Sequence, residues 1–268
     1  MSLRIQTNVE AANAHRYLTQ TSESLSKSME KLSSGYRINR AADDAAGLAI
    51  SEKLRAQIGG LKQANSNAQD GISLVQTAEG SLNEVHAMLQ RVRDLAVQYK
   101  NGTLSTDDRT AIQSEVNQLG SEIERIGQSA AFNGISLLAS SGTITFQVGA
   151  NDGDSIAVST ISLGTAVASS VFSLSTTGST DISQIDDAIN KVSAQRADFG
   201  AVQNRLEHTI NNLSTYQENL TASESQIRDV DMASEMVEFT KDQILQQAGT
   251  SMLSQANQLP NSVLSLLR

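Results

Sequence analysis

Histidine is the side chain best suited to proton transfer and metal binding near neutral pH, and this chain holds three. His15, His86 and His208 stand far apart, on three segments with helical patterns. None of them belongs to a His-Glu-x-x-His motif, and none has carboxylates at the spacing of a metal site. Serines and aspartates are numerous, but no base accompanies them as in a nucleophilic site. We therefore expect solvated or interface histidines, and neither enzyme activity nor a metal or cofactor.

The composition excludes further classes of protein. The net charge of −9 argues against nucleic-acid binding, which needs a concentrated basic surface. No stretch of about 18 apolar residues is present, so we expect no membrane-spanning helix. The first ten residues lack the continuous apolar core of a cleavable secretory signal, which suggests that any export uses another route. Cysteine is absent, so disulfides and thiolate metal sites are impossible.

With these functions excluded, the helical segments become the main candidates for carrying the function. The longest helix is expected between Leu54 and Tyr99. Its mostly apolar seam recurs in alternating steps of three and four, as in a helix packed lengthwise against others. Such a helix is about 68 Å long at roughly 1.5 Å per residue. Four glycines within it each cost about 0.5–1 kcal/mol relative to alanine, so the helix needs partners. Asn65 either fixes the register of this seam or is tolerated at a solvent-reached edge.

Two further helices supply those partners. The first follows the Asn101-Gly102 turn, where Ser105 and Asp108 have the spacing of a capping box. The second begins near Asp181 and carries one apolar row at strict intervals of seven. We expect the three helices to form an antiparallel rod. Its predicted core residues are Leu82, Val85, Leu89, Val92, Val192, Phe199, Leu206, Leu213 and Leu220.

The two ends of the chain have complementary charge and thin apolar stripes. Residues 1–40 carry a charge of +3 and the tail from residue 223 carries −3, which favours antiparallel pairing of two helices. Neither helix is apolar enough to stand alone, so we expect them to order on association. Pro260 either kinks the last helix or begins a new turn. The residues predicted to drive assembly are Leu18, Leu25, Met29, Leu32, Leu245, Met252, Leu259 and Val263.

Between the helices the hydrophobic period changes from 3.6 to 2. Ile144, Phe146 and Val148 alternate with polar residues, a glycine- and aspartate-rich turn follows, and Ile156 and Val158 alternate again. This pattern predicts a β-hairpin with a loop longer than two residues. We expect residues 139–180 to form this hairpin and a short, variable connector that is exposed and has weak strands.

These patterns predict a mainly α fold. It consists of an elongated, antiparallel, coiled-coil-like helical bundle with a small β-hairpin region and paired terminal helices. The predicted domains are residues 1–42 with 228–268 for the terminal helices, 43–138 with 181–227 for the rod, and 139–180 for the hairpin and connector.

Sequence blocks spread over nearly the whole chain resemble the bacterial flagellin family, the subunits of the flagellar filament. The similar segments are LSSGYRIN at 32–39, DDAAGLAI at 43–50, NAQDGIS at 67–73, LQRVRDLAV at 89–97, FNGISLL at 132–138, FQVGANDG at 146–153, GAVQNRLE at 200–207, QILQQAGT at 243–250 and VLSLLR at 263–268. Their number, and their presence in order at both ends, make the resemblance specific.

The resemblance implies a secreted structural subunit that polymerises into an extracellular filament used for swimming. It implies that the paired terminal helices form an inner coiled coil lining the central channel. The short middle region implies a thin, smooth filament. The family also implies unfolded export through the flagellar type III apparatus, a cytoplasmic chaperone on the C-terminal tail, and contacts with cap and junction proteins.

Hosts sense flagellins, and the resemblance implies two recognition sites here. A Toll-like-receptor site is implied at Gln90, Arg91, Leu95 and Glu115. An intracellular inflammasome sensor is implied to read Leu264, Leu266 and Leu267. Without the resemblance, Arg91 would be interpreted as a solvated helix charge.

Two other functions fit parts of the pattern. A hook–filament junction protein shares the terminal helices but caps a polymer instead of extending it. A coiled-coil adaptor would bind a partner and stop at a defined oligomer. Open-ended growth of filaments by the purified chain distinguishes the filament subunit from both.

Overall fold

The computed structural model describes residues 7–167, 169–175 and 181–266, without the side chains of residues 169, 170 and 259–266. The chain divides into two compact units. We call residues 1–56 with 219–268 the terminal unit and residues 57–218 the central unit. The domain boundaries expected from the sequence stay a prediction.

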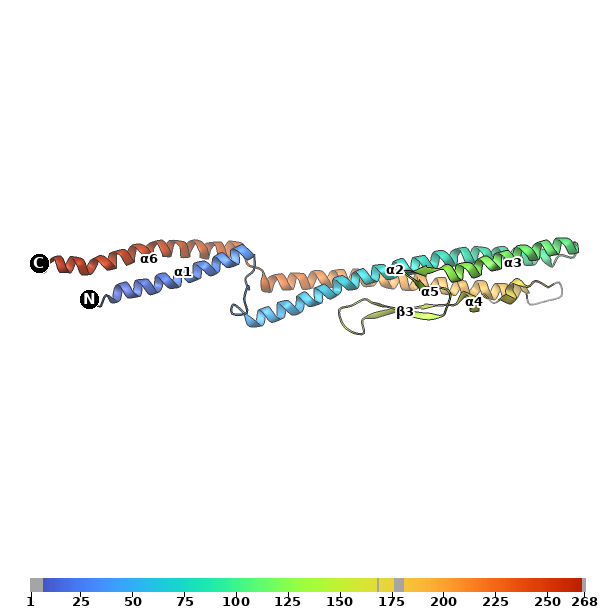
Figure 1. Ribbon diagram of the computed structural model, residues 1–268, viewed down its shortest axis with the longest axis horizontal. Helices are drawn as coiled ribbons and strands as arrows, with labels where there is room; N and C mark the ends of the chain where they lie inside the picture. Colours follow the sequence, from blue (N-terminus) through green and yellow to red (C-terminus); the bar gives the residue numbers. More distant parts are fainter. Residues whose placement is uncertain (1–6, 168, 176–180, 267–268) are drawn as a thin grey trace. The chain divides into compact units, whose positions relative to one another are not determined.

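Three long helices form the framework of the central unit (Figure 1). They are α2 (Ala45–Tyr99), α3 (Thr106–Ser129) and α5 (Asp181–Arg228), of which α2 and α5 also extend into the terminal unit. Ion pairs between Arg93 and Asp186 and between Glu79 and Arg196 show that α2 and α5 run antiparallel. The mainly α fold with long antiparallel helices is therefore confirmed.

Apolar residues at the predicted seam positions fill the space between these helices. Each side chain removed from water contributes about 1.5–3 kcal/mol, which offsets the cost of the glycines in α2. Asn65 uses its side-chain amide to donate a hydrogen bond to the Ser214 hydroxyl on α5, at 3.3 Å. The fully or almost fully buried positions are Leu82, Val85, Leu89, Val92, Val192, Phe199 and Leu206, with Leu213 at 8% exposure. Leu220 lies in the terminal unit and is half-buried.

The capping box predicted at the start of α3 is confirmed. The Ser105 hydroxyl accepts a hydrogen bond from the Asp108 backbone N–H at 3.2 Å, and the Asp108 carboxylate accepts one from the Ser105 backbone N–H at 3.0 Å. Hydrogen bonds from the Ser105 hydroxyl and backbone lower the pKa of Asp108. The helix therefore begins at a residue that the local sequence determines.

Two antiparallel strand pairs lie between α3 and α5. In the short pair, β1 (Ala131–Phe132) meets β2 (Ile135–Ser136) through Asn133 and Gly134, both of which have positive φ. Such a two-residue turn matches the twist of a hairpin. The longer pair, β3 (Gly142–Gln147) and β4 (Ser155–Thr160), is the predicted hairpin. Short helices α4 (Leu163–Ala166) and η1 (Ser169–Phe172) follow.

The expectation that residues 139–180 form an exposed connector is wrong for the part that the structure describes. Val158 is fully buried, and Leu163 and Val171 are nearly so. They join the same hydrophobic core as the helices. Side chains alternate between the two faces of a strand, so the apolar face of the hairpin packs on the bundle while the polar face stays exposed.

In the terminal unit, α1 (Val9–Ser34) and α6 (Met232–Leu266) lie side by side and antiparallel (Figure 1). The Asn8 side-chain amide donates to the Ala256 carbonyl at one end, and Lys31 pairs with Glu235 toward the other. The predicted pairing of the two chain ends is therefore confirmed. α6 is helical through Pro260, so this proline lies within the last helix and does not begin a new one.

Candidate functional site

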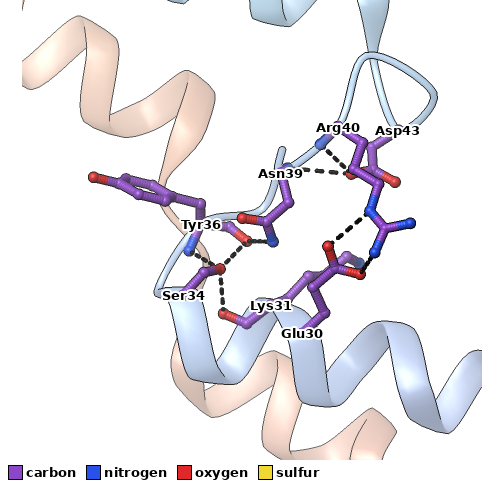
Figure 2. A network of polar contacts seen from close by, with 7 residues as sticks. All are labelled: Glu30, Lys31, Ser34, Tyr36, Asn39, Arg40 and Asp43. Carbon is purple, nitrogen blue, oxygen red and sulfur yellow. Dashed lines mark hydrogen bonds and ion pairs between the residues drawn. The ribbon is translucent and has the colours of Figure 1, made fainter.

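A polar network closes the loop between α1 and α2 (Figure 2). The Arg40 guanidinium donates two hydrogen bonds to the Glu30 carboxylate, both at 2.9 Å. The Asp43 carboxylate accepts from the backbone N–H groups of Arg40 and Asn39, which lowers the pKa of Asp43. One carboxylate thus fixes two consecutive peptide groups of the loop. The Asp44 carboxylate accepts a hydrogen bond from the Gly47 N–H at 2.8 Å and caps the start of α2.

Arg228 joins this loop to the other end of the chain. Its guanidinium carbon lies 4.8 Å from the centroid of the Tyr36 ring, and Nη1 lies 2.6 Å from a Glu52 carboxylate oxygen. The hydrogen bond from Arg228 lowers the pKa of Glu52. An antiparallel β-bridge between Tyr36 and Asp229 completes the contact. The end of α1, the start of α2, the end of α5 and the start of α6 are therefore tied together within the terminal unit.

Sequence reasoning missed this tie. Tyr36 and Arg228 are 192 positions apart, and nothing in the local pattern of either residue indicates its partner. The predicted boundary between residues 42 and 43 falls in this loop, but it does not indicate which residue the loop meets.

The faces by which α1 and α6 meet combine small residues with half-buried leucines. Ser28 on α1 and Ala256 on α6 are buried, and both are small. A Cβ atom at Gly249 would lie 3.3 Å from a Leu18 methyl carbon, so the two helices approach closely there. Few described residues of this pair are fully buried, so it removes less apolar surface from water than the core of the central unit does, and burial stabilises it less.

Large apolar side chains of both helices point away from this interface. On α6, Val237, Ile244 and Met252 are more than 60% exposed, and on α1 the same holds for Tyr17. Because these positions are spread around α6, the helix is apolar on faces that α1 does not cover. A helix with apolar residues all round is normally buried among several partners.

The residues predicted to drive assembly fall on both kinds of face. Leu18, Leu25 and Leu32 are half-buried on α1. Met29, Leu245 and Met252 are exposed, so their side chains do not serve the α1–α6 pairing itself. The side chains of Leu259 and Val263 lie outside the described residues. The role of the whole set in assembly stays a prediction.

A second candidate surface lies on α2 and α3 in the central unit. Arg91 donates from Nε and Nη2 to one oxygen of Glu115, at 2.9 and 2.8 Å, and both side chains are exposed by more than 40%. Gln90 is exposed beside them and contacts His86. Leu95, which the resemblance placed in the same site, is only 2% exposed and packs in the core. It therefore cannot offer its side chain to a partner in this fold.

The inflammasome set cannot be placed. Leu267 lies outside the described residues, and so do the side chains of Leu264 and Leu266. The structure gives these two residues only a helical backbone in α6.

The three histidines remain separate in the fold. His15 is exposed on α1, His86 contacts Gln90, and His208 lines an open cavity of about 670 Å³ beside the loop that joins β3 and β4. Among the described residues, no three histidine, cysteine or acidic side chains gather in a way that could hold a metal ion. In the same part of the chain, no helix combines the length and apolar character needed to cross a lipid bilayer.

Both the N-terminal and the C-terminal parts of the chain match known protein families. Residues 5–143 match the family model of the bacterial flagellin N-terminal helical region, and residues 182–267 match that of the bacterial flagellin C-terminal helical region. The chain is 53% identical to a flagellin of Halalkalibacterium halodurans over 98% of its length and 99% of that relative. It is 49% identical, with the same coverage, to the flagellar filament 33 kDa core protein of Treponema phagedenis.

A solved structure agrees with this similarity. The crystal structure of Bacillus cereus flagellin is 32% identical to the chain and superimposes with a TM-score of 0.52. The match covers 59% of this chain and 94% of that one.

Proposed function

Since the chain belongs to the bacterial flagellin family, whose members are structural subunits of the extracellular flagellar filament, we propose that its α1–α6 pair is the part that polymerises. The observation that carries this proposal is the exposed apolar surface of α6. Large side chains on several faces of this helix have no partner within the described residues. Further copies of the same pair would cover them, which couples ordering of the terminal unit to assembly.

A single substitution on α6 tests this proposal. Leu245→Asp places a charge on the exposed apolar face, at a position that is 48% exposed in the free subunit. We expect the variant to be soluble and as helical as the original chain by circular dichroism, but to form no long filaments in electron micrographs after seeding. Gln247→Asp is the matched control, because Gln247 is also exposed on α6 but polar. Long filaments from Leu245→Asp would contradict the proposal.

A truncation provides a second test. Removal of residues 243–268 deletes much of α6 and leaves the central unit intact. We expect a folded, soluble central unit that does not polymerise. Growth that stops at a defined oligomer in the full chain would instead favour the adaptor or junction protein, which the full-length similarity to flagellins does not favour.

The other family partners are proposals of the same kind. A cytoplasmic export chaperone would cover the exposed apolar faces of α6 before export, and cap and junction proteins would meet the same helices at the filament ends. We also propose a purely structural function, because the members of the flagellin family that the chain resembles over nearly its whole length are structural proteins.

Host recognition is proposed at Gln90, Arg91 and Glu115, with Leu95 as a core residue that holds α2 in place. The support is the exposure of these three side chains on neighbouring helices, together with the family resemblance. Arg91→Ala should lower Toll-like-receptor activation in a reporter cell assay by about tenfold or more, as for an interface arginine. Arg93→Ala is the matched control, since Arg93 is also exposed and ion-paired but contacts Asp186 on α5. Equal loss in both variants would contradict the assignment.

A further inference from the structure

The methionines of this chain are distributed unevenly between its two units. The sequence contains six, of which Met1 lies outside the described residues. Met88 on α2 is half-buried and packs against the core of the central unit. The remaining four lie on α1 and α6, and all are exposed by about half or more: Met29 at 56%, Met232 at 49%, Met236 at 48% and Met252 at 66%.

We propose that these four methionines are sites of oxidation by peroxides in the free subunit, and that their oxidation blocks polymerisation. The inference rests on the proposed function of the α1–α6 pair. A lone pair on each thioether sulfur attacks one oxygen of hydrogen peroxide, the O–O bond breaks, and the other oxygen leaves as water. The sulfur loses two electrons and becomes a sulfoxide, while the peroxide is reduced.

Two features of the chain direct oxidation to these positions. The chain has no cysteine, so methionine is its reactive sulfur. The exposed thioethers lie on helix surfaces that water already reaches, whereas Met88 is shielded by its packing on the core.

The product changes the character of the assembly surface. A sulfoxide is polar and accepts hydrogen bonds, so burying it against another copy leaves an oxygen without water or a donor. Methionine side chains already inside a polymer would be covered by neighbouring copies. Oxidation therefore acts on the free subunit, and a methionine sulfoxide reductase would restore it.

The test treats the purified full chain with hydrogen peroxide and maps sulfoxides by peptide mass spectrometry. We expect sulfoxide at Met29, Met232, Met236 and Met252 well before Met88, and a loss of seeded polymerisation measured by light scattering and electron microscopy. The concentration needed for growth should rise by about tenfold or more, and reductase treatment should reverse the change.

Variants make the assignment specific. A chain in which the four terminal methionines are replaced by leucine should polymerise after peroxide treatment as it does before. Met88→Leu should remain as sensitive as the original chain. Normal growth of the fully oxidised original chain would overturn the inference. So would equal sensitivity of the four-leucine variant. Failure of the untreated original chain to polymerise would instead overturn the proposed function.

Discussion

The two units of this protein use their apolar residues in opposite ways. The central unit places them in a shared core of three helices and a hairpin, with many positions below 2% exposure. The terminal unit leaves many of its large apolar side chains in water and pairs α1 with α6 through small, polar and half-buried apolar residues. The difference shows that two helical regions of one chain can have different roles. The central unit buries its apolar residues within itself, whereas the terminal unit keeps exposed apolar surface that, on the function proposed above, other copies would cover.

A charged substitution in each unit should give the largest difference in thermal stability between two variants. Leu206→Asp puts a carboxylate at a fully buried position of α5, and an unpaired buried charge costs several kcal/mol. We expect a sharply lower melting temperature and loss of helical signal in circular dichroism. Leu245→Asp should leave the melting of the central unit unchanged, since Leu245 is exposed on α6. Equal melting of the two variants would break the comparison.

Two glycine replacements should show how the tightness of packing varies within the central unit. A Cβ atom at Gly120 on α3 would lie 2.8 Å from the Phe172 ring, so Gly120→Ala forces that ring to move at a cost of about 1–3 kcal/mol. A Cβ atom at Gly80 on α2 meets nothing within 4 Å, so Gly80→Ala should stabilise by about 0.5–1 kcal/mol through helix propensity. Urea denaturation of both variants measures the two signs, and two changes of the same sign would contradict the packing described here.

The smallest expected effect is that of pH on the polar contacts made by Asp43 and Glu52 in the terminal unit. Hydrogen bonds hold the pKa of Asp43 and of Glu52 below the ordinary values of these side chains. A lowered folded-state pKa means that each group contributes stability above its unfolded pKa, and that this contribution is lost as pH falls through the folded pKa. Amide hydrogen exchange in residues 35–44 should therefore speed up, beyond its intrinsic pH dependence, as pH falls below about 4.

Asp43→Asn isolates the contribution of one carboxylate. The variant should show weaker protection of the Asn39 and Arg40 amides at neutral pH and less further loss in acid. Asp107→Asn is the control, because Asp107 is an exposed aspartate in the first turn of α3, in the central unit. An unchanged acid response in Asp43→Asn would assign the effect to other groups.

The sequence predicted the elements of this fold well where the signal is local. The seam of α2, the Ser105–Asp108 capping box and the β3–β4 hairpin all follow from spacings of two, three or four residues. The burial of the connector was missed, because a weak alternating pattern does not indicate which surface it will meet. Apolar periodicity placed Met252 in an apolar row, and family resemblance singled out Leu95, but only the fold places Leu95 inside and Met252 outside.

The candidate surfaces were predicted less completely, for a physical reason. The tie between Tyr36 and Arg228 depends on two residues that meet only after the chain has folded back on itself. A contact between residues so far apart in the sequence leaves no local pattern that a single sequence could reveal. Family resemblance singled out Gln90, Arg91 and Glu115 as proposed recognition residues, and the fold adds that they lie together on α2 and α3.

The pairing of the chain ends also sets the order of events during synthesis. Asn8 bonds to Ala256, which lies 248 positions later, so α1 has no partner until almost the whole chain has been made. At roughly 5–20 residues per second, that delay is on the order of 12–50 s, which is far longer than a helix needs to form or melt. The terminal unit therefore cannot fold during translation, and the nascent N-terminus stays open to whatever binds it first.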